Sequence, residues 1–300
     1  MVIIIDGNQL ACRCYFSLDK LTTKEGVRTE TIYGFLMSLK KIMREYKDEY
    51  STVFLTWDGG NDKRKAIYPL YKSGRKPFES AFYDQLEELR DIISRLGIKQ
   101  YHIKTVEADD LIGTLTLKSR KKGKNVFIVS SDHDFEQLIS RHVKVLHPMG
   151  KNIIKDVQYV LDTYEISPDR LVEVMSLTGD STDHIPGLEG VGDKTASRLI
   201  IANGCLDNVI TNVDNLMIMN RKGVKVAAKD ELKQQIKDNI ENIKLANKLV
   251  QIDCDLDIEP DFSQQLIDFK YVFEKFKTLD FEVFCNEFES WKVTFDLGSS

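Results

Sequence analysis

Short apolar runs alternate with segments of helical periodicity through the first half of the chain. The strand-like runs are "VIIID", "TVFLTWD", "YHIKTV", "VFIVSSD" and "VKVLHP", at residues 2–6, 52–58, 101–106, 126–132 and 143–148. Between them, apolar residues recur at helical spacing in residues 31–46, 78–96 and 108–119. Strands that alternate with helices are typical of a parallel sheet covered on both faces. The pattern therefore predicts an α/β fold with a mostly parallel central sheet flanked by helices.

Helical patterns replace the strand-like runs after about residue 165. Examples are "SPDRLVEVMSLTG", "DKTASRLIIANG" and "AKDELKQQIKDNIENIKLANKLV". Pro168 suits the first turn of a helix that begins after Ser167. We therefore expect an α/β core at residues 1–165 and a helical domain at residues 166–285, followed by a tail at residues 286–300 whose last six residues, 295–300, are loose.

The composition narrows the class of protein. The 300 residues carry a net charge of −5, include only six prolines and contain no low-complexity tract, which fits a globular protein. The first apolar run, "MVIIID", is too short for a signal peptide or a membrane span. The five scattered cysteines show neither a zinc-site spacing nor the even count of a disulfide framework. We therefore expect a protein of a reducing cytoplasm that does not associate with membranes.

Acidic residues gather at the ends of four predicted strands. They are Asp6, Asp58, Glu107, Asp109, Asp110, Asp132 and Asp134. Each acid alone fits a structural role as a helix cap, a turn residue or a partner of a helix dipole. Parallel strands, however, bring their carboxyl ends to one edge of the sheet, where open α/β sheets bind ligands. Carboxylates crowded at that edge would raise one another's pKa values unless a cation neutralised them, and oxygen ligands favour Mg²⁺ or Mn²⁺. His133 is expected to face away from this edge.

A further acidic pair, Asp180 and Asp183, lies in "TGDSTDHIPG". Alone, this pair fits a turn stabilised by its own aspartates equally well. The following "GLEGVGDKTA" predicts a turn into a helix, where Gly190 and Gly192 would let backbone N–H groups approach a phosphate. An ordinary joint between two helices would give the same pattern, so both interpretations stay open at this point.

A basic stretch with interleaved tyrosines, "KRKAIYPLYKSGRKP", follows the strand that ends at Asp58. Arg64, Lys72 and Arg75 are suited to phosphates, and Tyr71 offers a face for base stacking. A solvated basic loop is the alternative interpretation. The acidic net charge does not exclude a nucleic-acid partner. Without the nine proposed site acids the net charge of the chain would change from −5 to +4, so the remaining surface is mildly basic.

Five motifs, in this order, resemble those of the 5′-nucleases, the family that includes the 5′→3′ exonuclease domain of bacterial DNA polymerase I, phage 5′-exonucleases and flap endonucleases. They are "IIIDGNQLACRCYF", "TWDGGNDKRKAIYPLYKSGRKP", "TVEADDLIGTL", "VSSDHDFEQL" and "GDSTDHIPGLEGVGDKTA", within residues 3–200. The resemblance is strongest to the bacterial and phage branch. It implies a resolvase-like (PIN-like) nuclease core with an arch region at about residues 62–98, and a helix–three-turn–helix at about residues 176–202.

The same resemblance implies roles for individual residues. The acids that would hold two Mg²⁺ ions, with Mn²⁺ as a substitute, are Asp6, Asp58, Glu107, Asp109, Asp110, Asp132, Asp134, Asp180 and Asp183. Lys72 and Arg75 match the catalytic basic pair that contacts the scissile phosphate. The residues that match DNA-binding positions are Arg64, Tyr71, Gly190, Gly192, Lys194 and Thr195. The helix–three-turn–helix is also expected to coordinate K⁺.

The implied activity is two-metal hydrolysis of DNA phosphodiesters from or near the 5′ end, as exonuclease and flap endonuclease, in replication and repair. Expected partners are DNA with 5′ flaps, nicks or ends, and RNA primers. We expect a monomer in the cytoplasm of a bacterial or phage-infected cell.

Two other functions compete with this one: a structure-specific DNA-binding protein without catalysis, and a Mg²⁺ phosphatase built around residues 132–134. Asn8 stands where such a phosphatase would carry a second acid on its first strand. The chain departs from many 5′-nucleases at His184, where they carry Asn, and at Gln9, where they carry Ser. The segment after Arg75 is also short for a closed arch.

Overall fold

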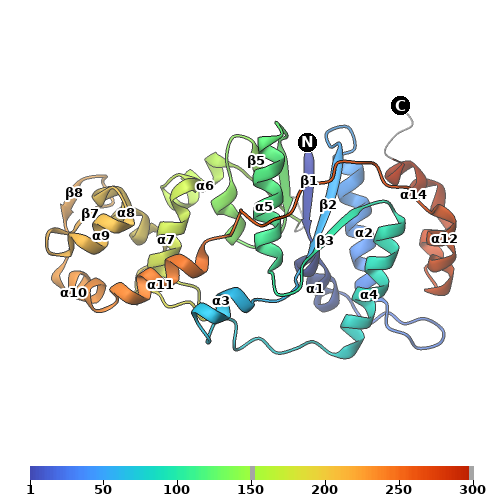
Figure 1. Ribbon diagram of the computed structural model, residues 1–300, viewed down its shortest axis with the longest axis horizontal. Helices are drawn as coiled ribbons and strands as arrows, with labels where there is room; N and C mark the ends of the chain where they lie inside the picture. Colours follow the sequence, from blue (N-terminus) through green and yellow to red (C-terminus); the bar gives the residue numbers. More distant parts are fainter. Residues whose placement is uncertain (149–152, 297–300) are drawn as a thin grey trace. The chain divides into compact units, whose positions relative to one another are not determined.

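The computed structural model describes residues 1–148 and 153–296, and the chain divides into two compact units (Figure 1). The first unit comprises residues 1–60, 76–131 and those from 254 onward; the second comprises residues 61–75 and 132–253. These units are defined by contacts and differ from the predicted domains, since residues 254–285 pack with the first unit rather than with the helical segment before them. The boundary at residue 165 stays a prediction.

The first unit contains four parallel strands in the order β3-β2-β1-β4. Their bounds are β1 (Val2–Asp6), β2 (Thr52–Trp57), β3 (Lys99–His102) and β4 (Val126–Val129). The register pairs Val2 with Thr52 on one side and with Val126 on the other. The central strand β1 is buried along its whole length, which explains its continuous apolar run. The predicted parallel sheet is confirmed.

Helices cover both faces of this sheet. Their bounds are α1 (Gly7–Ser17), α2 (Glu30–Glu45), α4 (Ser80–Arg95) and α5 (Ala108–Lys121). Figure 1 shows α5 on one side of the strands and α2 with α4 on the other. This arrangement follows from right-handed crossovers, because the chain steps from β1 to β3 in one direction and then returns past β1 to reach β4. The predicted helical periods at residues 31–46, 78–96 and 108–119 correspond to α2, α4 and α5.

The strand predicted at residues 101–106 lies instead at residues 99–102. After His102 the chain leaves the ladder and bonds to the loop that follows β2, with Gly59 N donating to Val106 O (2.9 Å) and Thr105 N donating to Gly59 O (2.7 Å). A Cβ atom on Gly59 would lie 1.8 Å from Ile103 O, so this close approach requires glycine. These hydrogen bonds between the two loops fix the backbone directly after Asp58.

The C-terminal part of the first unit is helical, with α12 (Phe269–Thr278), α13 (Glu282–Asn286) and α14 (Phe288–Phe295). The tail predicted from residue 286 thus contains the helix α14. Trp291 and Phe295 are buried, and their rings stack with centroids 5.5 Å apart. This aromatic packing holds a helix too short to be stable by itself. The last four residues of the predicted tail, 297–300, lie outside the described part of the chain.

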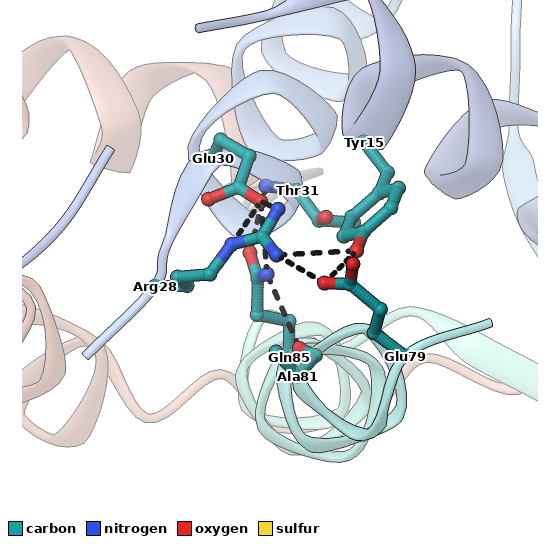
Figure 2. A network of polar contacts seen from close by, with 7 residues as sticks. All are labelled: Tyr15, Arg28, Glu30, Thr31, Glu79, Ala81 and Gln85. Carbon is teal, nitrogen blue, oxygen red and sulfur yellow. Dashed lines mark hydrogen bonds and ion pairs between the residues drawn. The ribbon is translucent and has the colours of Figure 1, made fainter. Parts of the chain in front are cut away.

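Arg28 organises a polar network that ties the loop before α2 to α1 and to the start of α4 (Figure 2). Its Nη1 donates to Glu79 Oε2 (2.8 Å) and to the Tyr15 hydroxyl (3.2 Å), and its Nε donates to Glu30 Oε1 (3.0 Å). Glu30 is fully buried, and Gln85 Nε2 of α4 also donates to Glu30 Oε1 (3.3 Å). The network therefore links α1, α2 and α4.

The second unit is mainly helical. Its helices are α3 (Asp62–Ile67), α6 (Val157–Tyr164), α7 (Leu171–Thr178), α8 (Asp193–Asn203), α9 (Leu206–Thr211), α10 (Asp230–Asp238) and α11 (Ile240–Val250). Two antiparallel strand pairs complete it: β5 (Val143–His147) with β6 (Ile153–Lys155), and β7 (Met217–Met219) with β8 (Lys225–Ala227). The predicted helical module is present. No helix in residues 1–148 and 153–296 has the length and apolar character needed to cross a membrane.

Candidate functional site

Asp6 and Asp58 lie at the carboxyl ends of neighbouring parallel strands in the first unit. Asp6 is buried at the end of β1; its Oδ1 accepts from Gln9 N (3.0 Å) and its Oδ2 accepts from Ser130 Oγ (3.0 Å). Asp58 follows β2 and is exposed, and its backbone N donates to Asn8 Oδ1 (2.8 Å). Asp6 thus acts as the N-cap of α1. A role as helix cap does not exclude a role as metal ligand, because each carboxylate oxygen keeps a second lone pair beside the hydrogen bond that it accepts.

The three acids of "VEADD" lie at the start of α5 in the same unit. Glu107 is the N-cap residue of the helix, and Asp109 and Asp110 lie in its first turn. Glu107 and Asp110 are buried, whereas Asp109 is partly exposed. A helix N-terminus favours negative charge, so the helix dipole accounts for part of this clustering.

The other four acids lie in the second unit, two after β4 and two in the loop after α7. Asp132 Oδ1 accepts from Asp134 N (2.9 Å), which holds those two residues in a tight turn. Asp180 Oδ1 accepts from Thr182 N (2.7 Å) and Asp183 N (3.2 Å). The predicted Asp-stabilised turn is therefore present, and it orients Asp180 and Asp183 together.

Asp134 interacts with the other three proposed site acids of its unit. Burial, followed by the negative charges of Asp132, Asp180 and Asp183, raises the pKa of Asp134 to about 7, and Lys72 opposes this shift. The side chains of two distant segments therefore interact electrostatically at one place. A carboxyl group with this pKa favours a nearby cation, which would stabilise its charged form.

Lys72 and Arg75 contact Asp183 directly. Arg75 Nη2 donates to Asp183 Oδ1 (2.5 Å), and Lys72 Nζ lies 3.5 Å from Asp183 Oδ2. The backbone joins the same two segments, since Lys72 N donates to Asp183 O (3.0 Å). Lys72 has a positive φ of 53° and is buried, so its position is set by tertiary contacts rather than by local preference. The predicted catalytic cations thus lie against a predicted metal ligand.

Gly74 permits a close contact between this basic segment and His184. A Cβ atom on Gly74 would lie 2.6 Å from Cε1 of the His184 ring. His184 itself has a positive φ of 58°, a conformation that Asn adopts more readily than most residues. The histidine at this position therefore packs on the loop that carries Lys72 and Arg75. Sequence reasoning did not identify Gly74.

Arg64 and Tyr71, predicted to bind DNA, are both buried in the structure. Arg64 Nε donates to Leu249 O (3.0 Å) and Nη2 donates to Gln251 O (2.9 Å), at the end of α11. Tyr71 packs in an apolar cluster with Ile185 and Leu249. In this structure both side chains anchor residues 61–75 to α11, and their contact with DNA stays a prediction.

The start of α8 carries the predicted phosphate-binding residues. Gly192 is the N-cap residue, and its carbonyl accepts from Thr195 N (2.9 Å). A Cβ atom on Gly190 or Gly192 would meet no atom within 4 Å, so the space beside both glycines is open. Lys194 is exposed, and its Nζ lies 3.9 Å from Glu165 Oε1.

A buried ionic network beside Asp134 was not predicted from the sequence. Glu136 Oε1 pairs with Lys155 Nζ, and both residues are buried. His133 Nδ1 lies 2.9 Å from the same Glu136 oxygen, and His133 lines the same cavity as Asp134 and Asp180, so its expected orientation away from the acids stays a prediction. Hydrogen bonding to Glu136 raises the pKa of His133. Only the fold could reveal the network, because Lys155 is 19 residues from Glu136.

A cavity of about 350 Å³ adjoins this network within the second unit. Its polar lining consists of His133, Asp134, Tyr164, Thr178, Asp180, Ser181 and Asp193. In the part of the chain that the structure describes, no three or more His, Cys, Asp or Glu side chains are grouped so that they could hold a metal ion. The predicted metal ligands therefore stay a prediction.

Comparison with known protein families assigns both halves of the chain. The model for the 5′-3′ exonuclease N-terminal resolvase-like domain matches residues 1–165, and the model for the 5′-3′ exonuclease C-terminal SAM fold matches residues 166–271. The chain belongs to the 5′-3′ exonuclease family. The resemblance inferred from the five motifs is thereby confirmed.

Curated relatives of two kinds match the chain. The thermostable DNA polymerase I of Thermus thermophilus is 34% identical over 264 residues, which are 88% of this chain and 30% of the polymerase. DNA polymerase I of Bacillus caldotenax is 33% identical, over 96% of this chain and 32% of the polymerase. The chain thus spans about a third of the length of these relatives. A 5′-3′ exonuclease of Buchnera aphidicola is 30% identical, over 86% of this chain and 88% of its own length.

Solved structures share the fold at lower identity. The bacteriophage T5 flap endonuclease, crystallised with DNA and metal ions, superposes with a TM-score of 0.67 at 16% identity, covering 99% of this chain and 98% of its own. The catalytic core of Rad2 in complex with DNA substrate gives the same TM-score and identity, covering 98% of this chain and 92% of its own. These likenesses establish the fold.

Proposed function

We propose that this chain is a Mg²⁺-dependent 5′-nuclease that hydrolyses DNA phosphodiesters from or near a 5′ end, as 5′→3′ exonuclease and flap endonuclease, in replication and repair. The observation that carries the proposal is the meeting of Asp134, Asp180 and Asp183 with Lys72 and Arg75 in the second unit. Family membership and the DNA-bound T5 and Rad2 structures support it.

The proposed metal ligands are the nine acids predicted from the sequence. Five belong to the first unit: Asp6, Asp58, Glu107, Asp109 and Asp110. Four belong to the second: Asp132, Asp134, Asp180 and Asp183. This donor set contains only carboxylate oxygens, which fits Mg²⁺ or Mn²⁺. The burial and carboxylate repulsion that raise the pKa of Asp134 are effects that a bound cation would offset. When bound, two Mg²⁺ ions supply Lewis-acid catalysis at a phosphodiester.

Lys72 and Arg75 would bind the phosphoryl oxygens of the scissile phosphate. In the free protein Asp183 pairs with both cations and holds them next to the proposed metal ligands. Fixed cations next to a phosphate stabilise the charge that grows on it during hydrolysis. The contact of His184 with Gly74 keeps this segment in place.

Gly190, Gly192, Lys194 and Thr195 would hold the DNA duplex through backbone N–H groups at the start of α8, with K⁺ bound in the same turn. This proposal rests on the open space beside the two glycines and on the helix dipole. Arg64 and Tyr71 would contribute by holding residues 61–75 against α11. The proposed substrates are DNA with 5′ flaps, nicks or ends, and also RNA primers. The protein would act as a monomer in the cytoplasm of a bacterial or phage-infected cell.

The test incubates the chain with end-labelled flap, nicked and single-stranded DNA, with Mg²⁺ or with a chelator. We expect products released from the 5′ end only with Mg²⁺. Asp109→Asn and Asp134→Asn should fold normally, by circular dichroism, and lose most cleavage. Cleavage at the parent rate by these variants would refute the assigned site. DNA binding without any Mg²⁺-dependent product would identify a DNA-binding protein instead of an enzyme.

A further inference from the structure

The β7–β8 hairpin of the second unit is strongly basic. Residues 216–229 contain four cations and no acidic residue. They are Arg221, Lys222, Lys225 and Lys229, and all four are exposed. The whole chain has a net charge of −5, so the charge of this hairpin is opposite in sign to that of the whole chain. Exposed cations concentrated on one element are a binding feature for polyanions.

Three cations that follow the hairpin in the chain are paired with acids. Lys233 Nζ lies 3.2 Å from Asp230, Lys237 Nζ lies 2.5 Å from Asp214, and Lys244 Nζ lies 2.8 Å from Glu241. By contrast, no carboxylate within residues 1–148 and 153–296 forms an ion pair with any of the four hairpin cations. The charge of the hairpin is therefore available to an external partner.

The hairpin is held rigidly. Asn220 Oδ1 accepts from the backbone N of Lys222 (2.9 Å) and Val224 (3.0 Å), which fixes the turn. At its base, Asn203 Nδ2 donates to Met217 O (2.7 Å) and Asn203 Oδ1 accepts from Met217 N (3.2 Å). Asn203 is the last residue of α8. The same helix thus carries the proposed phosphate contacts at its first turn and the basic hairpin at its end.

We propose that the β7–β8 hairpin is a second phosphate-binding surface that holds the backbone of duplex DNA beyond the turn at the start of α8. This inference rests on the proposed nuclease function. The 11 residues of α8 span about 16 Å. At 3.4 Å per base pair this length corresponds to at most about five further base pairs of duplex. The alternative role of these cations is to keep the two short edge strands from pairing with another chain, as lysines on edge strands often do.

The test compares a hairpin variant with a variant of equal charge. The hairpin variant is Arg221→Gln, Lys222→Gln, Lys225→Gln and Lys229→Gln. The control, which removes four cations that already have partners, is Lys233→Gln, Lys237→Gln, Lys244→Gln and Lys277→Gln. Circular dichroism melting confirms that both remain folded. Affinity for duplex DNA is measured by fluorescence anisotropy without divalent metal, between about 50 and 300 mM KCl.

We expect the hairpin variant to bind duplex at least about tenfold more weakly at low salt. The plot of log K against log salt should become shallower, with a slope smaller in magnitude by up to about 3.6, or 0.9 per lost contact. The control variant should keep the parent slope. Lengthening the duplex by about five base pairs should strengthen binding by the parent and not by the hairpin variant.

A hairpin variant with the affinity and slope of the parent would overturn the inference, and self-association of that variant would identify edge protection. Mg²⁺-dependent cleavage by the parent separates the two proposals. If the parent cleaves and only the hairpin result fails, this inference falls while the proposed function stands. If the parent neither binds nor cleaves DNA, both fall.

Discussion

Arg75 Nη2 donates a hydrogen bond to Asp183 Oδ1 at 2.5 Å, so a cation proposed to bind the phosphate rests on a carboxylate proposed to bind metal. The two residues are 108 positions apart. Asp183 is buried and Arg75 is exposed. The contact therefore fixes the position of the solvent-exposed Arg75 side chain. It holds the guanidinium group next to the place where the phosphate would lie.

Arg75→Gln should lower kcat by about 100-fold, because the variant lacks a fixed cation beside the phosphate when charge grows on it. Duplex affinity should change much less, since most of the proposed duplex contacts lie at the start of α8. Arg44→Gln, which removes an exposed arginine from the first unit, is the charge-matched control and should retain the parent kcat. Single-turnover cleavage and anisotropy separate the two quantities. An equal decrease of kcat in Arg75→Gln and Arg44→Gln would exclude a specific role for Arg75.

Mg²⁺ should stabilise the protein more at pH 8 than at pH 5.5. Burial and neighbouring carboxylates raise the pKa of Asp134 from 3.8 to about 7. Without metal, the stability contributed by the protonated Asp134 is present at low pH and is lost as the pH rises through about 7. Mg²⁺ binds the charged form, so its effect on Tm should grow over the same range.

Asp134→Asn should remove most of this pH dependence, because the amide neither titrates nor carries the charge that Mg²⁺ favours. Thermal melting at several pH values with and without Mg²⁺ provides the measurement. An equal Tm increase at pH 5.5 and pH 8 in the parent would contradict the prediction.

Gly74→Ala should destabilise the protein by no more than about 1 kcal/mol, because the new methyl group meets the ring of the exposed His184 side chain rather than backbone. The new Cβ would lie 2.6 Å from the His184 ring, so either the ring or the loop that carries Lys72 must move. The rate of DNA cleavage by Gly74→Ala should also fall, because this loop carries Lys72. The double variant Gly74→Ala with His184→Ala removes the clash and should recover stability in urea unfolding. If the double variant is no more stable than Gly74→Ala, the contact is not the cause.

Lys155→Met should cost about 3–5 kcal/mol of unfolding free energy, because it leaves the buried Glu136 carboxylate without its cation. His133 would then be the remaining basic partner of that carboxylate. Adding Glu136→Leu to Lys155→Met should restore much of the loss, since an apolar pair can replace a buried ion pair. Urea unfolding of the two single variants and the double variant gives the coupling energy. Additive losses would show that the two side chains do not depend on each other.

The local pattern of the sequence was sufficient for β1, β2 and α5, which hold the first five acids, although it misplaced the strand before α5. The apolar run that ends at Asp6 is buried on both faces, and the helical period of residues 31–46 matches the buried side of α2. These features depend on residues that are neighbours in the chain, so periodicity alone reveals them. The Asp-stabilised turn at Asp180 and Asp183 was predictable for the same reason.

Tertiary structure decided which distant side chains meet and which basic residues remain exposed. The sequence shows a basic stretch with tyrosines, but the fold buries Arg64 and Tyr71 against α11 and leaves Arg75 on Asp183. The Glu136–Lys155 pair and the base of the β7–β8 hairpin likewise join segments that carry no shared local pattern. Pairing across the fold depends on where the backbone returns in space, and hydrophobic periodicity records only which face of each element is buried.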